Sequence, residues 1–267
     1  MPPETVGGKS LRIESLAKTY RSRSGQESVA LAPVDFTIAA GEFVAVVGPT
    51  GCGKTTLLKI LAGVVAPSDG RAFVGDTPIL GPSIDRSVVF QNFALFPWLS
   101  VLGNVEFGLR SQGVASHECR QIAGEFLRTV GLADAKDKRP SELSGGMKQR
   151  CAIARAFAVR PSILLMDEPF GALDALTRRV MQRELVRIWR HHRTTVVFIT
   201  HAVEEAIYLA DRILVMTAHP GHIKAELGVT SARPRDETSP DFIELEREIY
   251  KLLDEELVKT FDLPAAT

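Results

Sequence analysis

One stretch of the chain, Phe43 to Gly63, restricts its fold more than any other. Its sequence, FVAVVGPTGCGKTTLLKILAG, predicts a short apolar strand over Phe43–Val47, a glycine-rich loop over Gly48–Lys54 and a helix that opens at Thr55. The loop contains the pattern G-x-x-x-x-G-K-T in the strand–loop–helix setting of a phosphate-binding P-loop. A glycine turn before a core helix would explain the glycines, but not the lysine and threonine that close the pattern. The sequence therefore predicts a nucleoside triphosphate site.

The chemistry of such a loop assigns roles to its residues. Gly48, Gly51 and Gly53 let the backbone curl so that successive N–H groups, with the positive end of the helix dipole, face a phosphate. Lys54 is expected to reach the β- and γ-phosphates, and the Thr55 hydroxyl to bind Mg²⁺. The other residues of the segment that we expect to contact the nucleotide are Pro49, Thr50, Cys52 and Thr56.

Cys52 lies inside this loop, close to Lys54 and a helix N-terminus, and both favour the reactive thiolate. The position predicts that alkylation of Cys52 inactivates the protein and that MgATP protects it. The alternative is a cysteine side chain that turns into the core and is inert. With Cys119 and Cys151 scattered elsewhere, we expect reduced thiols rather than a disulfide framework or a zinc site.

Length and charge narrow the possible classes further. The 267 residues fit one large α/β domain, or a domain with a small appendage. The formal net charge of +0 gives no general attraction for nucleic acid or an anionic membrane. No apolar run approaches the length of a membrane span, and the start, MPPETVGGKS, lacks the apolar core of a signal peptide. We therefore expect a cytoplasmic protein.

Apolar periodicity predicts strands and helices along the rest of the chain. The expected strands are Leu11–Leu16, Val34–Ile38, Arg71–Val74, Ser87–Phe90, Ile163–Met166, Thr195–Ile199, Arg212–Met216 and His222–Leu227. The expected helices are Val101–Arg110, His117–Val130, Gly145–Val159, one capped by Asp174 and ending near Trp189, and one ending at Leu209. The middle of the chain is thus helical where its flanks alternate strand and helix.

These patterns predict an α/β fold in which an α-helical subdomain is inserted into a P-loop NTPase core. We expect a flexible N-terminus over 1–10, an ATPase domain over 11–229 with the helical subdomain at about 92–160, and a linker and C-terminal helix over 230–267. That helix starts at Ser239-Pro240 and has one apolar stripe, formed by Phe242, Leu245, Ile249, Leu252 and Leu253.

Two further stretches have the chemistry of a nucleotide site. An apolar strand that ends in Asp167 is typical of a Walker B element, whose aspartate holds Mg²⁺. Glu168 follows, where a carboxylate could polarise the attacking water. Tyr20 lies on a polar stretch before the P-loop strand and could stack on adenine. Taken alone, these residues are more often an ordinary strand end and a half-buried surface tyrosine.

The segment Leu143-Ser144-Gly145-Gly146-Met147 makes the sequence resemble the ATP-binding cassette (ABC) ATPases, whose signature is LSGGQ. The resemblance covers roughly residues 11–227, and Met147, where glutamine is usual, is its one departure. It implies that the P-loop core is RecA-like and that an antiparallel β subdomain lies at its N-terminus. It identifies, in family order, Tyr20 as the A-loop, 48–55 as Walker A, Gln91 as the Q-loop, 143–147 as the signature, 163–168 as Walker B, 172–174 as the D-loop and His201 as the switch histidine.

What the resemblance implies is a shared ATP site. Two copies of the chain would associate head to tail, so that Ser144, Gly145 and Gly146 of one copy cover the γ-phosphate on the other's P-loop. His201 would contact the γ-phosphate and hold the attacking water. Gln91 would complete the Mg²⁺ coordination begun by Thr55 and Asp167, and Asp174 would reach across the dimer. Because Ser144 and Gly146 are intact, Met147 is not expected to abolish function.

Within the family, three segments resemble the ATPases of nitrate, sulfonate and taurine importers: QNFALFPWLSVLGNV, FGALDALTR and MTAHPGHI. This likeness implies two integral membrane permease subunits, a periplasmic or extracellular solute-binding protein, and a peripheral location on the cytoplasmic face of the inner membrane. The alternative is a soluble ABC ATPase acting on nucleic acid or ribosomes. The chain has neither the long coiled coil nor the second cassette typical of those classes, so no nucleic-acid partner is expected.

The stretch after Gln91 is expected to be the docking surface for a membrane subunit. Its apolar residues crowd around Pro97, so no regular helix can bury them all, and exposed aromatic residues of this kind mark partner sites. The alternative is that they pack within the helical block. The residues concerned are Phe93, Leu95, Phe96, Trp98 and Leu99.

Overall fold

The computed structural model describes residues 7–218 and 220–261, with side chains as far as Glu256. The chain divides into two compact units. We call Ile84–Thr194 the helical unit, and Lys9–Ser83 with Thr195–Thr267 the sheet unit. Residues 1–6 of the expected N-terminal tail lie outside the described residues.

The sheet unit begins with an antiparallel sheet in the order β2-β1-β4-β5. The long strands β1 and β2 pair from Leu11↔Ile38 to Arg21↔Glu27, so both extend well beyond the ranges expected from the sequence. The short strand β5 was not expected. The bounds of the sheet are β1 (Leu11–Arg21), β2 (Glu27–Ile38), β4 (Asp69–Val74) and β5 (Thr77–Pro78).

The second sheet of this unit is centred on the strand that precedes the P-loop. Strand β3 (Phe43–Val47) pairs in parallel with β8 (Thr195–Ile199) and β9 (Arg212–Met216), and β10 (Ile223–Gly228) closes the edge antiparallel to β9. Every residue of β3 and β8 is buried, which explains their uninterrupted apolar runs. The sheet thus fixes the start of the P-loop from both sides.

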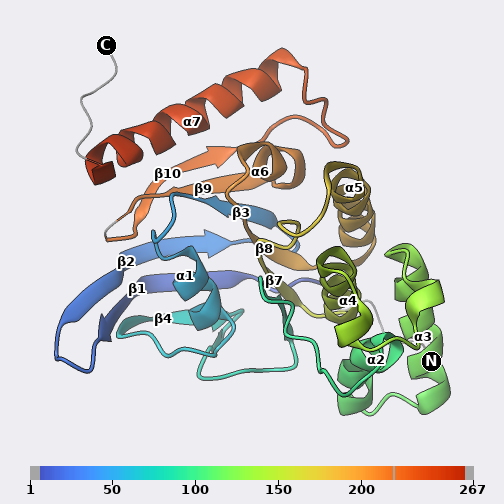
Figure 1. Cartoon of the computed structure of the whole chain (residues 1–267). Helices are drawn as coiled ribbons and strands as arrows, with labels where there is room; N and C mark the ends of the chain where they lie inside the picture. Colours follow the sequence, from blue (N-terminus) through green and yellow to red (C-terminus); the bar gives the residue numbers. More distant parts are fainter. Residues whose placement is uncertain (1–6, 219, 262–267) are drawn as a thin grey trace. The chain divides into compact units, whose positions relative to one another are not determined.

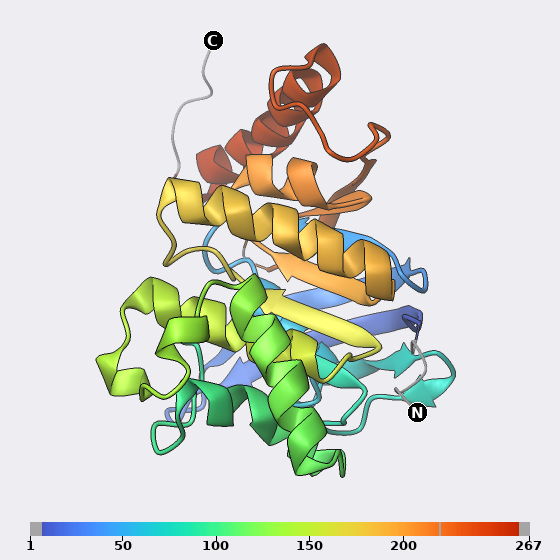
Figure 2. The same cartoon turned by 90° about the vertical axis from the view of Figure 1, so that its right-hand side faces the viewer.

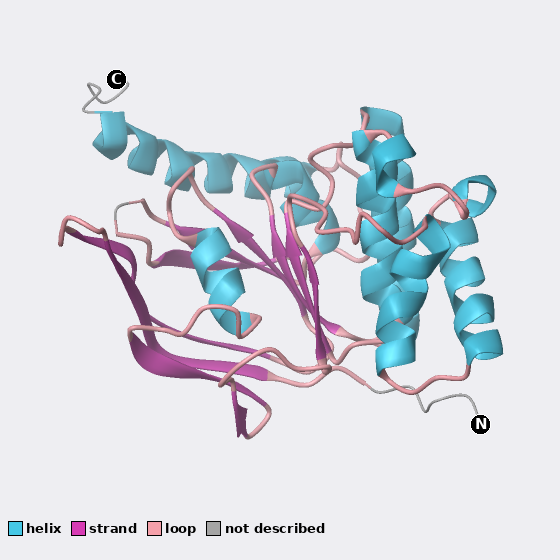
Figure 3. Cartoon of the chain, turned by 60° about the horizontal axis from the view of Figure 1, so that its bottom comes forward, coloured by secondary structure: helices cyan, strands magenta, loops and turns pink. Residues whose placement is uncertain are grey.

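Three helices complete the sheet unit (Figure 1). Helix α1 (Lys54–Leu61) follows the P-loop, α6 (Val203–Leu209) follows β8, and the long α7 (Pro240–Phe261) lies beside α6 and β9. Figure 3 shows α1 and α7 as the cyan helices next to the magenta strands of this unit. Two residues of the predicted apolar stripe of α7, Phe242 and Ile249, are buried.

The segment before α7, which the sequence presents as a linker, is anchored by two arginines. Arg233 donates to the carbonyl oxygen of Leu209 and, at 2.7 Å, to Asp211 Oδ1. Arg235 donates to the carbonyl oxygens of Ile207 at 2.7 Å and Tyr208 at 3.2 Å. The carbonyl end of α6 is therefore capped by cations from this segment, as the helix dipole favours.

The helical unit has a parallel strand pair, β6 (Arg86–Val89) and β7 (Ile163–Asp167), together with four α-helices and two short 3₁₀ turns. Helices α2, α3 and α4 pack pairwise on one another and form the green cluster of Figure 2. A Cβ atom at Gly108 would overlap the Val159 side chain, so α2 and the end of α4 approach closely there. The helices are α2 (Val101–Ser111), α3 (Ser116–Thr129), α4 (Gly145–Ala158) and α5 (Ala175–His192), and the turns are η1 (Ala133–Ala135) and η2 (Pro140–Glu142).

The predicted fold class is confirmed: an α/β chain with an N-terminal antiparallel sheet and a block of helices in its middle. Within the described ranges, no helix combines the length and the apolar character that crossing a bilayer requires.

Candidate functional site

The P-loop has the backbone that phosphate binding requires. Gly51 and Gly53 have φ values of 83° and 91°, in the left-handed region that glycine adopts without strain. A Cβ atom at Gly48 would lie 2.7 Å from Cys52 Sγ and 2.9 Å from the Met216 carbonyl oxygen. Two of the three glycines are therefore required by conformation and the third by close packing.

The N-terminus of α1 is open to an anion. The helix begins at Lys54, one residue earlier than expected, and its N-cap, Gly53, provides no capping side chain. Lys54 is buried, and its Nζ donates to the carbonyl oxygens of Gly48 at 2.7 Å and Pro49 at 2.9 Å. The ammonium is thus held inside the curl of the loop. Thr50 and Thr55 are exposed beside it, so the loop presents N–H groups, one cation and hydroxyls, as a nucleotide phosphate and its Mg²⁺ require.

The orientation of Cys52 supports the inert alternative. Its side chain is fully buried, and Sγ lies 3.5 Å from Lys54 Nζ. Because the thiol faces into the loop, an alkylating reagent cannot reach it while the P-loop keeps this conformation. The expectation of a readily alkylated cysteine is therefore corrected by the structure.

We predict that N-ethylmaleimide modifies Cys52 far more slowly in the native protein than in the protein unfolded in guanidinium, because reaction requires the loop to open. Peptide mass spectrometry over a time course measures both rates. A cysteine introduced at the exposed Asp137 is the matched control and should react at once in the native protein. Equal native rates at residues 52 and 137 would contradict the prediction.

Two other predicted residues belong to the sheet unit. Tyr20, near the end of β1, is 41% exposed, and Lys18 Nζ lies 5.2 Å from its ring centroid. An exposed ring is consistent with a stacking role. His201 is exposed directly after β8. The residue before it, Thr200, is buried and donates from Oγ1 to Glu205 Oε2 at 2.8 Å.

Glu205 helps to position His201, and the sequence analysis did not predict this role. Its carboxylate is buried and receives the Thr200 hydroxyl, while the Ala202 N–H donates to Thr200 Oγ1 at 3.0 Å. These contacts fix the backbone on both sides of His201. The position of Glu205, five residues after Thr200 and on the first turn of α6, could have predicted this contact, because a carboxylate there can reach back to the end of the strand.

In the helical unit the structure brings Gln91 and Glu168 together. Gln91 Nε2 donates to Glu168 Oε2 at 3.0 Å. Glu168 is half-buried and has a φ of 47°, a left-handed conformation that costs about 1 kcal/mol for a non-glycine residue. Asp167, the last residue of β7, is 4% exposed. A residue with a strained backbone next to a buried aspartate is the kind of outlier found at functional sites.

The signature segment forms the start of α4. Ser144 is its N-cap, and Ser144 Oγ accepts the Met147 N–H at 3.3 Å. Only the backbone of Met147 takes part, which is why the capping geometry does not depend on the glutamine usual there. A Cβ atom at Gly146 would lie 3.4 Å from Leu173 Cδ2 and 3.5 Å from the Ala172 carbonyl oxygen. The glycines of the signature therefore lie against the D-loop of the same chain.

Asp174 acts locally as the N-cap of α5. It accepts the Thr177 N–H at 3.0 Å and the Thr177 hydroxyl at 2.7 Å. These hydrogen bonds lower the pKa of the Asp174 carboxyl below its usual value. Its expected role across a dimer stays a prediction.

The predicted residues therefore form two groups. The sheet unit contains the P-loop, Tyr20 and His201, and the helical unit contains the rest. The donor types fit the expected ligand: a P-loop with an uncapped helix N-terminus suits a triphosphate, and hydroxyl, amide and carboxylate oxygens suit Mg²⁺. The helical group consists of Gln91, Ser144, Gly145, Gly146, Asp167, Glu168 and Asp174.

Comparison with known proteins gives a consistent result. Residues 31–171 match the family model described as ABC transporter. An ABC transporter ATP-binding protein of Methanocaldococcus jannaschii is 46% identical over 250 residues, which covers 94% of this chain and 93% of that protein. The bicarbonate transport ATP-binding protein CmpD of Synechocystis is 48% identical, covering 85% of this chain and 81% of that protein. The nitrate import ATP-binding protein NrtD of Synechococcus elongatus is 43% identical, covering 87% and 85%.

Solved structures agree with these sequence matches. A dimeric ATP-binding cassette in a post-hydrolysis state, bound to ADP and Pi, superposes with a TM-score of 0.76 at 31% sequence identity. The match covers 83% of this chain and 100% of that chain.

Proposed function

Because this chain belongs to the ABC transporter family, we propose that it is the ATP-hydrolysing subunit of an importer for a small anionic solute of the nitrate, sulfonate or taurine type. The chain is an ATPase of that family, and its predicted kinship with anion-importer ATPases is confirmed. The observation that most supports this proposal is the similarity to NrtD, which is named for nitrate import, and to CmpD, which is named for bicarbonate transport, because nitrate and bicarbonate are both small anions.

In this proposal each group acts on MgATP according to its chemistry. The P-loop N–H groups and Lys54 bind the phosphates, and Tyr20 stacks on the adenine. Thr55, Gln91 and Asp167 supply oxygens of the kind that hold Mg²⁺, which when bound neutralises charge on the phosphates. Glu168 accepts a proton from the attacking water.

The proposed assembly contains two copies of the chain, two membrane permease subunits and an external solute-binding protein. In each ATP site, Ser144 to Gly146 and Asp174 of one copy would complete the P-loop of the other. The dimeric state of the cassette bound to ADP and Pi supports this arrangement. The protein would then be peripheral to the cytoplasmic face of the membrane.

The segment after Gln91 has the construction expected of a docking surface, with one correction. Of its five apolar residues only Trp98 is largely exposed, at 68%, while the other four are half-buried. Phe107 of α2, which the sequence analysis did not include, is 45% exposed. The Phe96 ring lies between these two, with centroid distances of 5.7 Å to Trp98 and 4.3 Å to Phe107. Trp98 and Phe107 therefore form the exposed part of one aromatic cluster.

The backbone under this cluster is held firmly from the helices. Arg155 of α4 donates to the carbonyl oxygens of Phe93 at 3.1 Å and Ala94 at 2.6 Å, where both residues have positive φ values. The buried Asn104 accepts the Phe96 N–H at 2.8 Å and donates to the Phe96 carbonyl at 3.2 Å. An exposed aromatic pair on a rigid support suits a permanent protein partner.

The double variant Trp98→Asp and Phe107→Asp tests both the surface and the assignment of the chain to a membrane transporter. We expect wild-type chain to co-purify with membrane subunits from detergent-solubilised membranes, and the variant to lose them while it binds MgATP normally. Leu80→Asp, which places the same charge at another exposed apolar residue, should leave co-purification unchanged. Recovery of the wild-type chain with ribosomes or DNA instead would favour the alternative, and assembly by the double variant would rule out this surface.

A further inference from the structure

In the sheet unit, the backbone that follows β9 packs directly against the P-loop. A Cβ atom at Gly221 would overlap the carbonyl oxygen of Cys52 and lie 3.1 Å from that of Ala30. The same Ala30 oxygen lies 2.5 Å from the position of a Cβ at Gly53. Since the φ of Gly221 is outside the left-handed region, glycine is needed here for space alone. Three stretches of backbone therefore meet at the phosphate loop without a side chain between them.

Gly221 is tied to the first sheet as well. Its carbonyl oxygen accepts the Ala32 N–H at 2.8 Å, and it forms an isolated parallel bridge with Leu31 of β2. The contact between Gly221 and Cys52 is therefore maintained by backbone pairing with β2. The backbone at Gly221 has a defined position between β2 and the P-loop.

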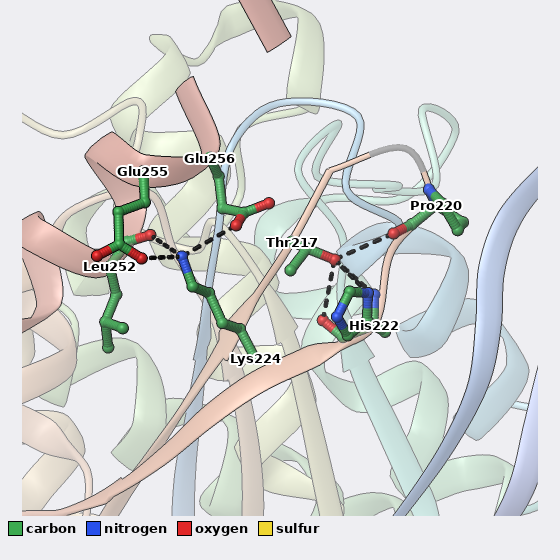
Figure 4. A network of polar contacts seen from close by, with 7 residues as sticks. All are labelled: Thr217, Pro220, His222, Lys224, Leu252, Glu255 and Glu256. Carbon is green, nitrogen blue, oxygen red and sulfur yellow. Dashed lines mark hydrogen bonds and ion pairs between the residues drawn. The ribbon is translucent and has the colours of Figure 1, made fainter. Parts of the chain in front are cut away.

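The buried Thr217 hydroxyl helps to hold the backbone on both sides of Gly221 (Figure 4). The Thr217 N–H adds a bond of 3.0 Å to the His222 carbonyl oxygen. Thr217 Oγ1 accepts the His222 N–H at 3.1 Å and lies 3.0 Å from the Pro220 carbonyl oxygen and 2.7 Å from His222 Nδ1. When Nδ1 bears a proton, the hydroxyl donates to the Pro220 carbonyl oxygen and accepts from the backbone N–H and the ring Nδ1–H of His222, so its full hydrogen-bonding capacity is used. Thr217 is buried, so water cannot replace these bonds without opening the turn.

The strand that leaves this turn is anchored to the C-terminal helix. Lys224 Nζ donates to the Leu252 carbonyl at 2.8 Å, to Glu255 Oε2 at 2.8 Å and to Glu256 Oε1 at 2.9 Å (Figure 4). Its side chain is only 16% exposed, and that of Glu256 only 4%. The backbone at Gly221 is therefore fixed on both sides. The Thr217 hydroxyl holds it on one side, and the contacts of Lys224 with α7 hold it on the other.

We propose that Thr217 and Gly221 are positioning residues for the ATPase reaction, acting through the P-loop backbone. Phosphate affinity depends on where the loop N–H groups point, and the peptide of Cys52 is one of those that the Gly221 backbone supports. Thr217 keeps that support in place. The inference rests on the proposed function, since it takes the P-loop as the triphosphate site.

The first test compares Thr217→Val, which keeps the shape and removes the hydroxyl, with Thr217→Ser, which keeps the hydroxyl. Loss of a buried hydrogen-bonding group should raise the Kd for MgADP and the KM for MgATP about fivefold, with kcat little changed. Thr217→Ser should restore both values. Thr238→Val, which removes an exposed hydroxyl bonded to Asp236, is the matched control and should bind normally.

The second test adds a methyl group to the contact itself. Gly221→Ala must displace the Cys52 peptide, and we expect nucleotide affinity to fall about tenfold or more. Gly228→Ala is its control, because a Cβ there meets nothing within 4 Å. Should Gly221→Ala fail to fold, the pair of Thr217 variants still decides the question.

These variants distinguish the proposed nucleotide site from the proposed positioning role of Thr217 and Gly221. Lys54→Ala must abolish MgADP binding if the P-loop is the nucleotide site, and normal binding there would overturn the proposed function itself. If Lys54→Ala loses binding while Thr217→Val and Gly221→Ala bind normally, only the positioning role fails. A Thr217→Val protein with a lower urea midpoint but unchanged KM would likewise assign Thr217 to stability alone.

Discussion

The Glu168→Gln variant is expected to lose ATP turnover by at least about 100-fold, the usual contribution of a general base, while it still binds MgATP. The carboxylate of Glu168 accepts a hydrogen bond from Gln91, and a glutamine oxygen can accept the same bond. The amide cannot, however, take a proton from water. The substitution therefore removes the chemistry and keeps the shape of the site.

Phosphate release under saturating MgATP measures turnover, and size-exclusion chromatography with MgATP shows whether the trapped nucleotide holds two copies together. Glu184→Gln, which loses only a surface ion pair with Arg187, should hydrolyse ATP at the wild-type rate. Wild-type turnover in Glu168→Gln would remove Glu168 from its proposed role.

The second large effect concerns stability rather than catalysis. The Arg235 guanidinium, 7% exposed as a residue, donates to four carbonyl oxygens, those of Ile207, Tyr208, Val229 and Ser231. Burial, aided by the neighbouring Arg233, lowers the pKa of Arg235 to about 10, so it remains charged at neutral pH. Replacing it with leucine would leave these carbonyls without their donor.

We expect Arg235→Leu to lower the free energy of unfolding by about 3 kcal/mol, because several buried acceptors lose a charged donor at once. Urea unfolding followed by far-UV circular dichroism measures the change. Arg247→Leu, on the exposed side of α7, should shift stability by no more than about 0.5 kcal/mol. A similar small shift in Arg235→Leu would mean that the segment before α7 is not an anchor.

Some of the fold follows directly from the order of residues. The strands that flank the P-loop, β3 and β8, are buried along their whole length, so their sequences are unbroken apolar runs that periodicity detects. By contrast, β2 begins at Glu27 and its first half is largely exposed. That half is a strand because its backbone pairs with β1 across a short turn, as in Tyr20↔Ser28. Its exposed residues carry no apolar alternation that periodicity could detect.

The site divides in the same way. Spacing predicted the P-loop and Glu168 as site residues, because a phosphate and its Mg²⁺ demand particular residue types at fixed intervals. It could not give the inward orientation of Cys52 or the exposure of Phe107, since both depend on what packs around them. Thr217 and Gly221 were missed for a related reason. They act through backbone contacts, which the identity of a side chain does not reveal.

The support beneath Trp98 has a mechanical consequence. Arg155 and Asn104 bind the main chain of Phe93, Ala94 and Phe96 at several points, so this stretch cannot bend independently of α2 and α4. We therefore expect a force applied at Trp98 to move α2 and α4 together with this stretch. The segment next to Gln91 is then expected to move as one body with the helices α2 and α4, and not by itself.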